Sequence, residues 1–305
     1  MTQTHFMQTG HCGKPHYRFR KAAFFTPPEI PIVVARDVHR KRIHRHLHEF
    51  MELVIITGGT ARHVVGQAGW PVAAGNVFVI GRGQLHSYQA PKSLTLINIL
   101  YEPERLSLPF RDLRTLPGFH ALFALEPVWH DHTFPAAGLR LAAKELVQVE
   151  ELARVLEDEL RTRRPGYKFM AVAFFMQIVG FLARCYDQSA VPGGSALLRL
   201  GQAISYMESH YDQRISMSKL AGRAGLSKRH FERMFQEALH IAPLHYLIRL
   251  RIRRAAGILR QGVSIKEVMH QVEFRNSSYF SRQFRHLMGV SPQEFRRRAI
   301  HYGDI

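Results

Sequence analysis

The chain of 305 residues contains few cysteines, few tryptophans and few acidic side chains. Its two cysteines, Cys12 and Cys185, lie too far apart to form a metal-binding or redox motif, and this usage is typical of a reduced, cytoplasmic compartment. The N-terminal residues lack the apolar core of a signal peptide. The most apolar run, Phe169–Ala183, is shorter than the roughly 20 residues that span a bilayer. We therefore expect a buried helix here and no membrane partner.

Basic residues are abundant and unevenly placed. The chain has 42 lysines and arginines against 24 acidic residues, a net charge of +18. Residues 195–305 alone hold 19 basic and 8 acidic residues. A local excess of this kind is expected of a surface that binds a polyanion. A solvated basic face that only aids solubility is the alternative, and charge alone leaves it open.

One helical pattern occurs twice between Ser216 and Arg298. Phe231 and Phe280 are 49 residues apart, as are Pro243 and Pro292. Upstream of the turns the offset is 48, so the second turn contains one added residue. An internal repeat of this length indicates a small helical unit used twice. Because the repeat coincides with the basic region, it favours nucleic acid as the partner.

Short β-rich segments punctuated by glycine precede the helical part of the chain, which predicts a sandwich or barrel. Around Leu139 the period changes to that of helices, with an amphipathic stripe that ends near Arg164 and a second helix over Tyr167–Cys185. Ser189–Ser195 has the composition of a linker. The expected strands are Ile32–Val34, Glu52–Thr57, Ala61–Val65, Val77–Ile80 and Leu94–Leu100, and the stripe consists of Leu146, Val149, Leu152, Leu156 and Leu160.

Each copy of the repeat predicts a helix-turn-helix, whose second helix enters the DNA major groove. In the first copy Ser216 or Ser218 caps the first helix, Gly225 makes the turn and Ser227 caps the second helix, which buries Phe231, Phe235 and Leu239. In the second copy Ile265–Val272 is the first helix, and Asn276 or Ser277 caps the second, which buries Phe280 and Phe284. The polar residues expected to face DNA are Lys228, Arg229, Glu232, Arg233, Gln236, Arg275, Asn276, Ser278, Ser281, Arg282 and Arg285.

A helix from Pro243 to Gln261 is expected between the copies. At about 1.5 Å per residue it forms a rod of roughly 27 Å, which could hold two recognition helices in successive major-groove segments about 34 Å apart. Its apolar stripe is Leu244, Ile248, Ile252, Ala255 and Leu259. Arg249, Arg251, Arg253 and Arg254 are expected on its exposed side, where they contact phosphates or only solubilise the rod.

These C-terminal residues resemble the DNA-binding domain of the AraC/XylS family of transcription regulators. The resemblance rests on Leu220-Ala221, the turn Gly225–Ser227, the phenylalanine-rich recognition helices and the closing motif Gly289–Arg296. It covers about a hundred residues. Three positions depart from the family pattern: Glu273 and His240 stand where glycine is usual, and Met269 replaces a small residue. We therefore expect surer base contacts from the first copy than from the second.

The β-rich half contains a pattern that resembles the two signature motifs of the cupin barrel: His46, His48 and Glu52, followed by His86. His46 and His48 point to the same side of a strand because they are two residues apart, Glu52 lies an even step further on, and His86 would arrive from another strand. The four could hold a divalent transition metal or could hydrogen-bond a polar small molecule, and Tyr88 and Trp70 could stack on a sugar ring or belong to the core. The metal reading supports a rival function, a metal-dependent cupin enzyme such as a sugar isomerase or dioxygenase.

The family resemblance favours a ligand sensor over an enzyme, because regulators of this family pair a sensor cupin with the DNA-binding domain. Ile97–Leu106 and Leu116–Pro127 resemble the rhamnose-responsive regulators of the family, which implies L-rhamnose or a related 6-deoxy sugar as the effector. The helical stripe could pair with its copy in another subunit, or could only pack on the next helix. Dimerisation is favoured because such regulators usually read paired half-sites.

The sequence thus predicts an α+β multidomain protein with a cupin-type sensor domain over 1–138, a helical dimerisation and coupling region over 139–194 and an all-α DNA-binding domain over 195–305. It predicts a cytoplasmic transcription activator without catalytic residues. Its expected partners are double-stranded DNA, a sugar effector and a second copy of the chain, with RNA polymerase a further candidate. The one cofactor candidate is a divalent metal ion held by His46, His48, Glu52 and His86.

Overall fold

The computed structural model describes residues 17–25, 30–106, 112–128, 138–188 and 196–301. The chain divides into two compact units, residues 1–201 and 202–305, and the division falls inside helix α5, Ala196–Ser209. The first unit contains the β-sheet and two long helices, and the second is helical, so the expected α+β multidomain class is confirmed. Cys12 and the expected linker Ser189–Ser195 lie outside the described residues.

The described strands of the first unit form one curled sheet around β7, a strand of 16 residues. The second half of β7 pairs with β2, and the first residues of β7 pair with β3. Strand β4 runs antiparallel to β7 along the whole length of β7. Only β1, which lies parallel to β3, breaks the antiparallel pattern. The strands are β1 (Tyr17–Phe19), β2 (Ile32–His39), β3 (Ile43–His48), β4 (Met51–Val65), β5 (Ala68–Ala73), β6 (Asn76–Ile80), β7 (His86–Tyr101) and β8 (Leu139–Arg140).

The glycine pair Gly58-Gly59 was expected to separate two strands but lies inside one. Register shifts against β7 occur between Ile56 and Gly58 and again up to Arg62, so the glycines form bulges in a continuous strand. A Cβ on Gly59 would lie 2.2 Å from the carbonyl oxygen of Ser93, which explains why a glycine is needed at this close backbone approach. The structure also contains β1, β3 and β5, which the hydrophobic pattern does not predict.

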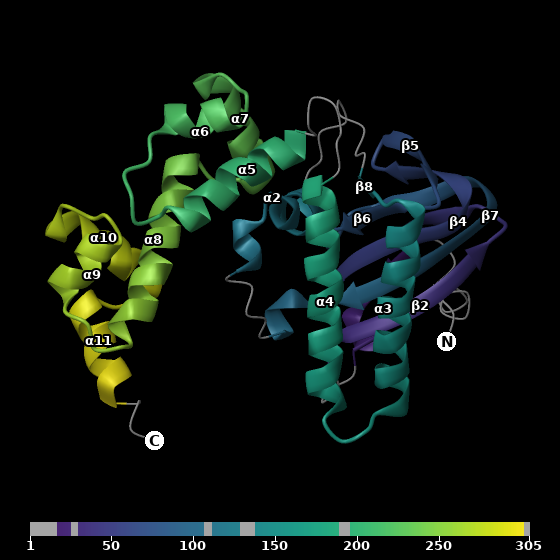
Figure 1. Cartoon of the computed structure of the whole chain (residues 1–305), viewed down its shortest axis with the longest axis horizontal. Coiled ribbons are helices and arrows are strands. Elements are labelled where there is room, and N and C mark those ends of the chain that lie inside the picture. Colours follow the sequence, from purple (N-terminus) through teal and green to yellow (C-terminus); the bar gives the residue numbers. More distant parts are fainter. Residues whose placement is uncertain (1–16, 26–29, 107–111, 129–137, 189–195, 302–305) are drawn as a thin grey trace. The chain divides into compact units, whose positions relative to one another are not determined.

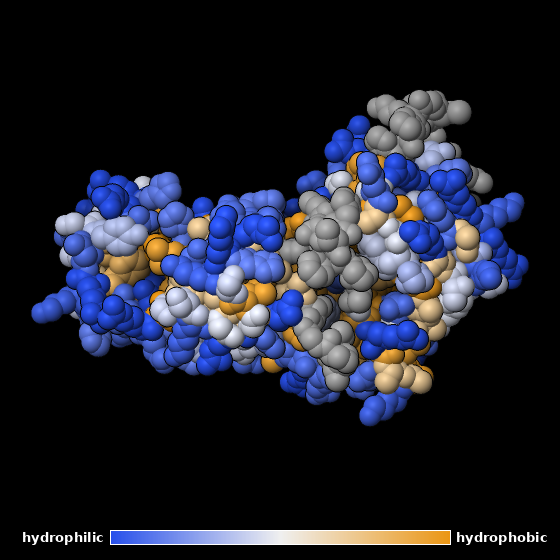
Figure 2. Space-filling model, turned by 90° about the horizontal axis from the view of Figure 1, so that it is seen from above, coloured by the Kyte–Doolittle hydropathy of each residue, from blue (hydrophilic) through white to orange (hydrophobic). Residues whose placement is uncertain are grey.

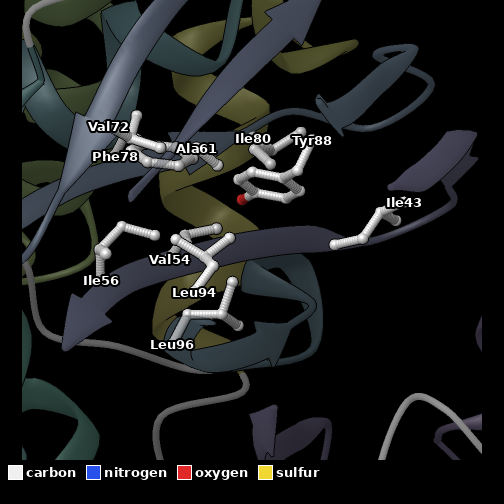
Figure 3. Close-up of a cluster of buried hydrophobic side chains, with 10 residues drawn as sticks. All are labelled: Ile43, Val54, Ile56, Ala61, Val72, Phe78, Ile80, Tyr88, Leu94 and Leu96. Carbon is white, nitrogen blue, oxygen red and sulfur yellow. The ribbon is translucent and has the colours of Figure 1, made fainter. Parts of the chain in front are cut away.

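The interior of the curled sheet is apolar at one end. Side chains from β3, β4, β5, β6 and β7 meet there, and Trp70 packs against them from its partly buried position. Figure 3 shows the ring of Tyr88 extending into the middle of this cluster. The cluster consists of Ile43, Val54, Ile56, Ala61, Val72, Phe78, Ile80, Tyr88, Leu94 and Leu96.

Two long helices lie side by side over the sheet (Figure 1). They are α3 (Ala143–Thr162) and α4 (Tyr167–Gln188). From the expected stripe on α3, Val149 and Leu156 are fully buried, and Arg36 of β2 donates a 2.7 Å hydrogen bond to Glu157. The short helix α2 (Pro117–Phe119) and the π-helical turn His120–Leu125 also pack near α4. The stripe therefore packs at least partly within its own chain.

Helix α4 is longer than the apolar run that predicted it. With 22 residues it is long and apolar enough to cross a membrane by length and composition, the one such helix among the described residues. Its fully buried residues, Phe175, Ile178 and Leu182, belong to the core of the first unit. Burial of this kind is typical of a core helix.

The second unit consists of helices around one central rod. Figure 1 shows the pairs α6–α7 and α9–α10 toward opposite ends of α8. Hydroxyl or amide oxygens cap the helices of both pairs: Ser216, rather than Ser218, accepts from the Lys219 amide at 3.1 Å, and Asn276, rather than Ser277, accepts from Tyr279 at 2.7 Å. The helices are α6 (Met217–Arg223), α7 (Lys228–Leu239), α8 (Pro243–Leu259), α9 (Ile265–Gln271), α10 (Ser277–Met288) and α11 (Pro292–His301).

Most of the expected apolar residues of this unit are buried, with two exceptions. Leu239 is only half-buried, because α7 turns Met234 and Ala238 into the core beside Phe231 and Phe235. Leu244 is 52% exposed, and Leu247 is buried in its place.

Two arginines expected on the exposed side of the rod are instead used inside the unit. Arg251 donates hydrogen bonds to the carbonyl oxygens of Tyr211 at 2.8 Å, Gln213 at 2.7 Å and Glu273 at 3.3 Å. Arg254 is bound to the buried carboxylate of Glu208 at 3.0 Å. Arg251 fixes loop residues to the rod and Arg254 fixes helix α5 to it, whereas Arg249 and Arg253 are exposed as expected. Hydrophilic side chains cover most of the face shown in Figure 2, and hydrophobic residues appear there as scattered patches.

Candidate functional site

The expected ligand residues come from three strands of the curled sheet, and Tyr88 connects them to the apolar cluster. His46 and His48 lie on β3, Glu52 on β4, and His86 and Tyr88 on β7. All five are buried. His46 and His86 are cross-strand partners, and their ring centroids are 4.0 Å apart. The pairing of the strands thus brings together residues up to 42 positions apart in the sequence.

The carboxylate of Glu52 lies at the centre of the three imidazoles. His48 Nε2 is 3.0 Å and His86 Nε2 3.6 Å from Glu52 Oε2. Ligand atoms of His46, Glu52 and His86 all lie within 4.8 Å of one another. We call His46, His48, Glu52 and His86 the histidine cluster. A separation of this size is what a single bound ion or hydroxyl group can bridge.

Backbone carbonyl groups orient the imidazoles of the histidine cluster. The Nδ1 atom of His46 lies 3.0 Å from the His44 oxygen, that of His48 2.6 Å from Phe50, and that of His86 3.1 Å from Gln84. A carbonyl oxygen only accepts, so each Nδ1 is protonated and donates. The Nε2 lone pairs of neutral rings are then directed away from the backbone. This is the tautomer that metal-ligating histidines adopt.

Burial keeps the rings of His46 and His86 neutral. Loss of solvent lowers the pKa of His46 and holds that of His86 well below its ordinary range, where the neighbouring histidines lower it further. The nearby Glu52 carboxylate opposes the shift at His46. Neutral imidazoles offer lone pairs rather than positive charge. The site therefore suits a cation or the hydroxyl groups of a neutral ligand better than an anion.

A fourth histidine, His63 on β4, borders the same site and was not predicted. Its ring is stacked between Phe78 and Tyr88, at centroid distances of 4.6 and 4.8 Å, and lies 5.8 Å from the ring of His86. Neither of its nitrogens has a hydrogen-bond partner in the described part of the chain. Burial lowers the pKa of His63 to about 3. A buried polar group without a partner is uncommon and calls for an explanation.

The two aromatic residues suggested for sugar stacking differ in position. Tyr88 is fully part of the apolar cluster, and its burial, with the charge of Glu52, holds the pKa of the hydroxyl well above its ordinary value. Trp70 is only partly buried and meets His63 edge-on at a centroid distance of 5.0 Å. Trp70 thus keeps exposed aromatic surface beside the site, whereas the face of Tyr88 is covered by His63.

In the second unit the polar residues expected to face DNA lie on the outer sides of α7 and α10. Lys228, Arg229, Arg233 and Gln236 are exposed, and Glu232 is half-exposed beside Lys228, with 3.9 Å between their charged atoms. On and before α10, Arg275, Ser278, Arg282 and Arg285 are exposed, whereas Ser281 is half-buried. The exposed side chain of Asn276 is engaged in capping α10.

The two positions that depart from glycine adopt the backbone conformation that glycine favours. His240 has φ of +53° and Glu273 has φ of +52°, both in the left-handed region. The second turn is held in place nonetheless: the Glu273 carbonyl accepts from Arg251, and its carboxylate lies 3.1 Å from Arg275. The departure therefore leaves a strained residue rather than a different turn.

Both halves of the chain match models of known families. Residues 32–170 match the AraC-like ligand binding domain, and residues 220–298 match a helix-turn-helix domain. The chain belongs to the AraC family. The first match covers the strands β2–β8 with the histidine cluster, and the second covers both helix-turn-helix units.

Several curated relatives in the AraC family span nearly the whole chain. The HTH-type transcriptional activator RhaR of Mannheimia succiniciproducens is 28% identical over 279 residues, which are 91% of this chain and 96% of the relative. RhaR of Klebsiella pneumoniae is 29% identical over 284 residues, 92% of this chain and 96% of the relative. Among solved structures, an AraC-type regulator from Chromobacterium violaceum is 30% identical and covers 33% of this chain and 91% of its own, with a TM-score of 0.32.

The family assignment gives the coarse function. This AraC-family chain is a DNA-binding transcription regulator that combines a ligand-binding domain with a double helix-turn-helix domain. The named relatives are transcriptional activators. The histidine cluster lies in the ligand-binding part, and the exposed basic faces of α7 and α10 lie in the DNA-binding part.

Proposed function

We propose that the chain is a cytoplasmic transcription activator whose DNA binding is controlled by a neutral sugar, L-rhamnose or a related 6-deoxy sugar. The observation that supports this most is the histidine cluster: three buried imidazoles and a buried carboxylate converge inside an AraC-type ligand-binding domain. Convergent polar groups in an otherwise apolar barrel are the usual form of a small-molecule site. The relatives named RhaR support a sugar as the ligand.

The N-terminal strand provides a route from the ligand to the rest of the molecule. Strand β1 lies parallel to β3, with Tyr17 opposite His46 and Phe19 opposite His48. The ring of Phe19 meets that of His46 edge-on at 5.4 Å. A ligand that contacts His46 and His48 therefore also changes what β1 packs against. We propose that the sugar favours one arrangement of this arm and so shifts the population of DNA-binding states.

Direct contact with DNA is assigned to the exposed faces of the two recognition helices. Lys228, Arg229, Arg233 and Gln236 of α7 would read one major-groove segment, with Glu232 at its edge. The second copy would read the next segment through Arg275, Ser278, Ser281 and Arg282, with Asn276 positioned by its role as a cap. The rod α8, with 17 residues, sets the separation between the two.

Homodimerisation is proposed through the helical region 139–194. Large apolar side chains remain exposed on both long helices: Val147 is 67% exposed and Phe169 77%. A second copy of the same surface would cover them in a symmetric contact. RNA polymerase is the proposed further partner of an activator of this kind.

The histidine cluster also fits a divalent metal ion. His46, Glu52 and His86 offer two imidazoles and one carboxylate with their ligand atoms within 4.8 Å of one another, and His48 lies beside them, which is a donor set for a transition metal such as Zn²⁺, Mn²⁺ or Fe²⁺. A bound ion would act as a Lewis acid toward hydroxyl or carbonyl oxygens of the ligand. This donor set is the observation that favours the second candidate function, a metal-dependent cupin enzyme such as a sugar isomerase or dioxygenase.

A sugar screen separates these functions. The intact chain is heated with each of a panel of sugars, and the hit is then incubated with the chain and analysed for product, with the metal content measured in parallel. The sensor function predicts stabilisation without turnover and loss of the stabilisation in His48→Ala. Formation of a product would favour the enzyme, and stabilisation that persists in His48→Ala would remove the histidine cluster from the ligand site.

A further inference from the structure

A groove in the second unit lies between the start of the rod α8 and the recognition helix α10. Its volume is about 400 Å³. Ile248 and Leu287 contribute apolar floor, and the polar wall includes His245, Arg249, Arg282 and His286. We call it the α8–α10 groove. All of these residues belong to the same compact unit.

The α8–α10 groove is lined by basic side chains without acidic ones. No aspartate or glutamate is among its described lining residues. Within the described chain Arg249 makes no ion pair, whereas Arg254, five residues further along the rod, is paired with Glu208. The guanidinium of Arg282 stacks over the ring of Tyr279 at 5.4 Å, a contact that leaves its in-plane N–H groups available to an anion. The charge of the groove therefore calls for an anionic partner.

The position of the α8–α10 groove identifies that anion. Arg282 lies on the outer face of α10 with Ser278 and Arg285, and it also lines the groove. A helix in the major groove has a phosphate backbone along each side, and most protein–DNA hydrogen bonds go to these phosphates. A duplex read by α10 therefore brings one backbone against the side of α10 that faces Arg249.

We propose that the α8–α10 groove seats a phosphate of the DNA backbone that borders the major groove read by α10. Arg249 and Arg282 bind the phosphate oxygens, and His245 and His286 line the sides of the seat. The contact does not depend on the base sequence, and it fixes the register of α10 on the duplex. This inference rests on the proposed double helix-turn-helix reading of DNA and adds a phosphate seat at the edge of the α10 recognition face, where Arg249 of the rod joins Arg282.

The test compares Arg249→Ala with Arg297→Ala, which removes the same charge from an exposed side chain on α11. A duplex is first selected from a random pool by the intact chain, and dissociation constants are then measured against salt for this duplex and an unrelated one. For Arg249→Ala we expect binding to both duplexes to weaken about tenfold, with a salt slope smaller by about 1. Arg297→Ala should behave as the intact chain does, and the thermal unfolding of both variants should match it.

A neutral phosphate locates the contact. Single methylphosphonate linkages are placed one at a time along the selected duplex. One linkage should weaken binding by the intact chain and have no further effect on Arg249→Ala. If Arg249→Ala binds the duplex with an unchanged salt slope, or if no single linkage behaves in this way, the phosphate seat is overturned while the proposed reading of DNA stands. If the intact chain selects no duplex, the proposed reading of DNA fails with it. Competition by millimolar inorganic phosphate with the intact chain but not with Arg249→Ala, in the absence of such a linkage, would assign the groove to free phosphate and also overturn the seat.

Discussion

Two buried histidines of the first unit illustrate how local surroundings set the role of one residue type. His120 is hydrogen-bonded, with Nε2 2.7 Å from the carbonyl oxygen of Arg114. His63 is equally buried but has no such partner within the described residues. A satisfied imidazole contributes to stability, whereas an unsatisfied one costs about 1–3 kcal/mol. We propose that His63 is retained despite this free-energy cost because its imidazole contacts the ligand.

Replacing the two histidines by phenylalanine should therefore have opposite effects. His63→Phe removes an unpartnered polar ring from an aromatic stack, so we expect a free energy of unfolding higher by roughly 1 kcal/mol together with a weaker response to the sugar. His120→Phe removes the donor of a buried hydrogen bond and should lower stability. Denaturant unfolding and sugar-induced thermal shifts provide both readouts. An intact sugar response in His63→Phe would leave His63 as a core residue only.

The hydrogen-bonded histidine also predicts a pH dependence. Burial lowers the pKa of His120 to about 4, while the unfolded chain has an ordinary value near 6.5. As pH falls below about 6.5 the unfolded state takes up a proton that the folded state excludes, so stability is present above this pH and is lost on acidification. We expect His120 to account for a loss of about 2 kcal/mol between about pH 7 and pH 5. The free energy of unfolding of His120→Gln should lack this part of the loss on acidification. Equal stability–pH profiles for His120→Gln and the intact chain would contradict the assignment to His120.

The histidine cluster could be predicted from the sequence, but His63 could not. Simple alternation relates His46 and His48 on β3, whereas Glu52 joins them from the start of β4, just after the turn that follows β3. His63 lies 11 positions after Glu52, an odd step that places it on the opposite face of an ideal strand. The bulges between Ile56 and Arg62 change this parity and turn His63 inward. A residue beyond a bulge cannot be assigned to a face from spacing alone.

At the scale of elements, the second turn of the repeat stores strain in one residue. Glu273 has the left-handed φ of +52° where the first copy has Gly225 at φ +63°. A side chain in this region costs about 1 kcal/mol or more, whereas glycine adopts it freely. Glu273 thus occupies the position where the family usually has glycine by adopting one left-handed backbone angle.

Glu273→Gly should relieve this strain. We expect an unchanged or higher free energy of unfolding, with a gain of up to about 1 kcal/mol. The matched control is Glu237→Gly in α7, where the side chain lies 3.9 Å from Arg233 in a comparable surface pair and glycine in a helix costs about 1 kcal/mol. Urea unfolding of both variants measures the difference. Equal losses at the two positions would contradict the strain at Glu273.

Caps and recognition helices could be predicted because their determinants are local. Ser227 and Asn276 accept the hydrogen bonds that their positions require, and the phenylalanines of α7 and α10 are buried. The arginines of the rod could not be sorted in the same way. Arg251 binds carbonyl oxygens of three residues 22 to 40 positions away, and such distant acceptors leave no trace in a helical pattern. Charge patterning alone therefore overstates the DNA-facing surface.

At the scale of the whole molecule, the proposed function requires coupling between the histidine cluster in the first unit and the recognition helices α7 and α10 in the second. The composition already distinguishes the two, since the second unit carries a net charge of +10 in 104 residues and the first +8 in 201 residues. The ligand-binding and DNA-binding halves match separate family models. Coupling between sugar binding and DNA binding cannot be read from either site alone. It is measured as the difference in DNA affinity between the sugar-free and the sugar-bound chain.

The most direct measurement is the DNA affinity of the intact chain with and without L-rhamnose, or whichever sugar stabilises the protein, at fixed salt on the selected duplex. The account predicts a change in the dissociation constant of at least about fivefold, and the reciprocal change in sugar affinity when DNA is bound. His48→Ala should retain DNA binding and lose the change. An equal DNA affinity at zero and saturating sugar would contradict sugar control of DNA binding.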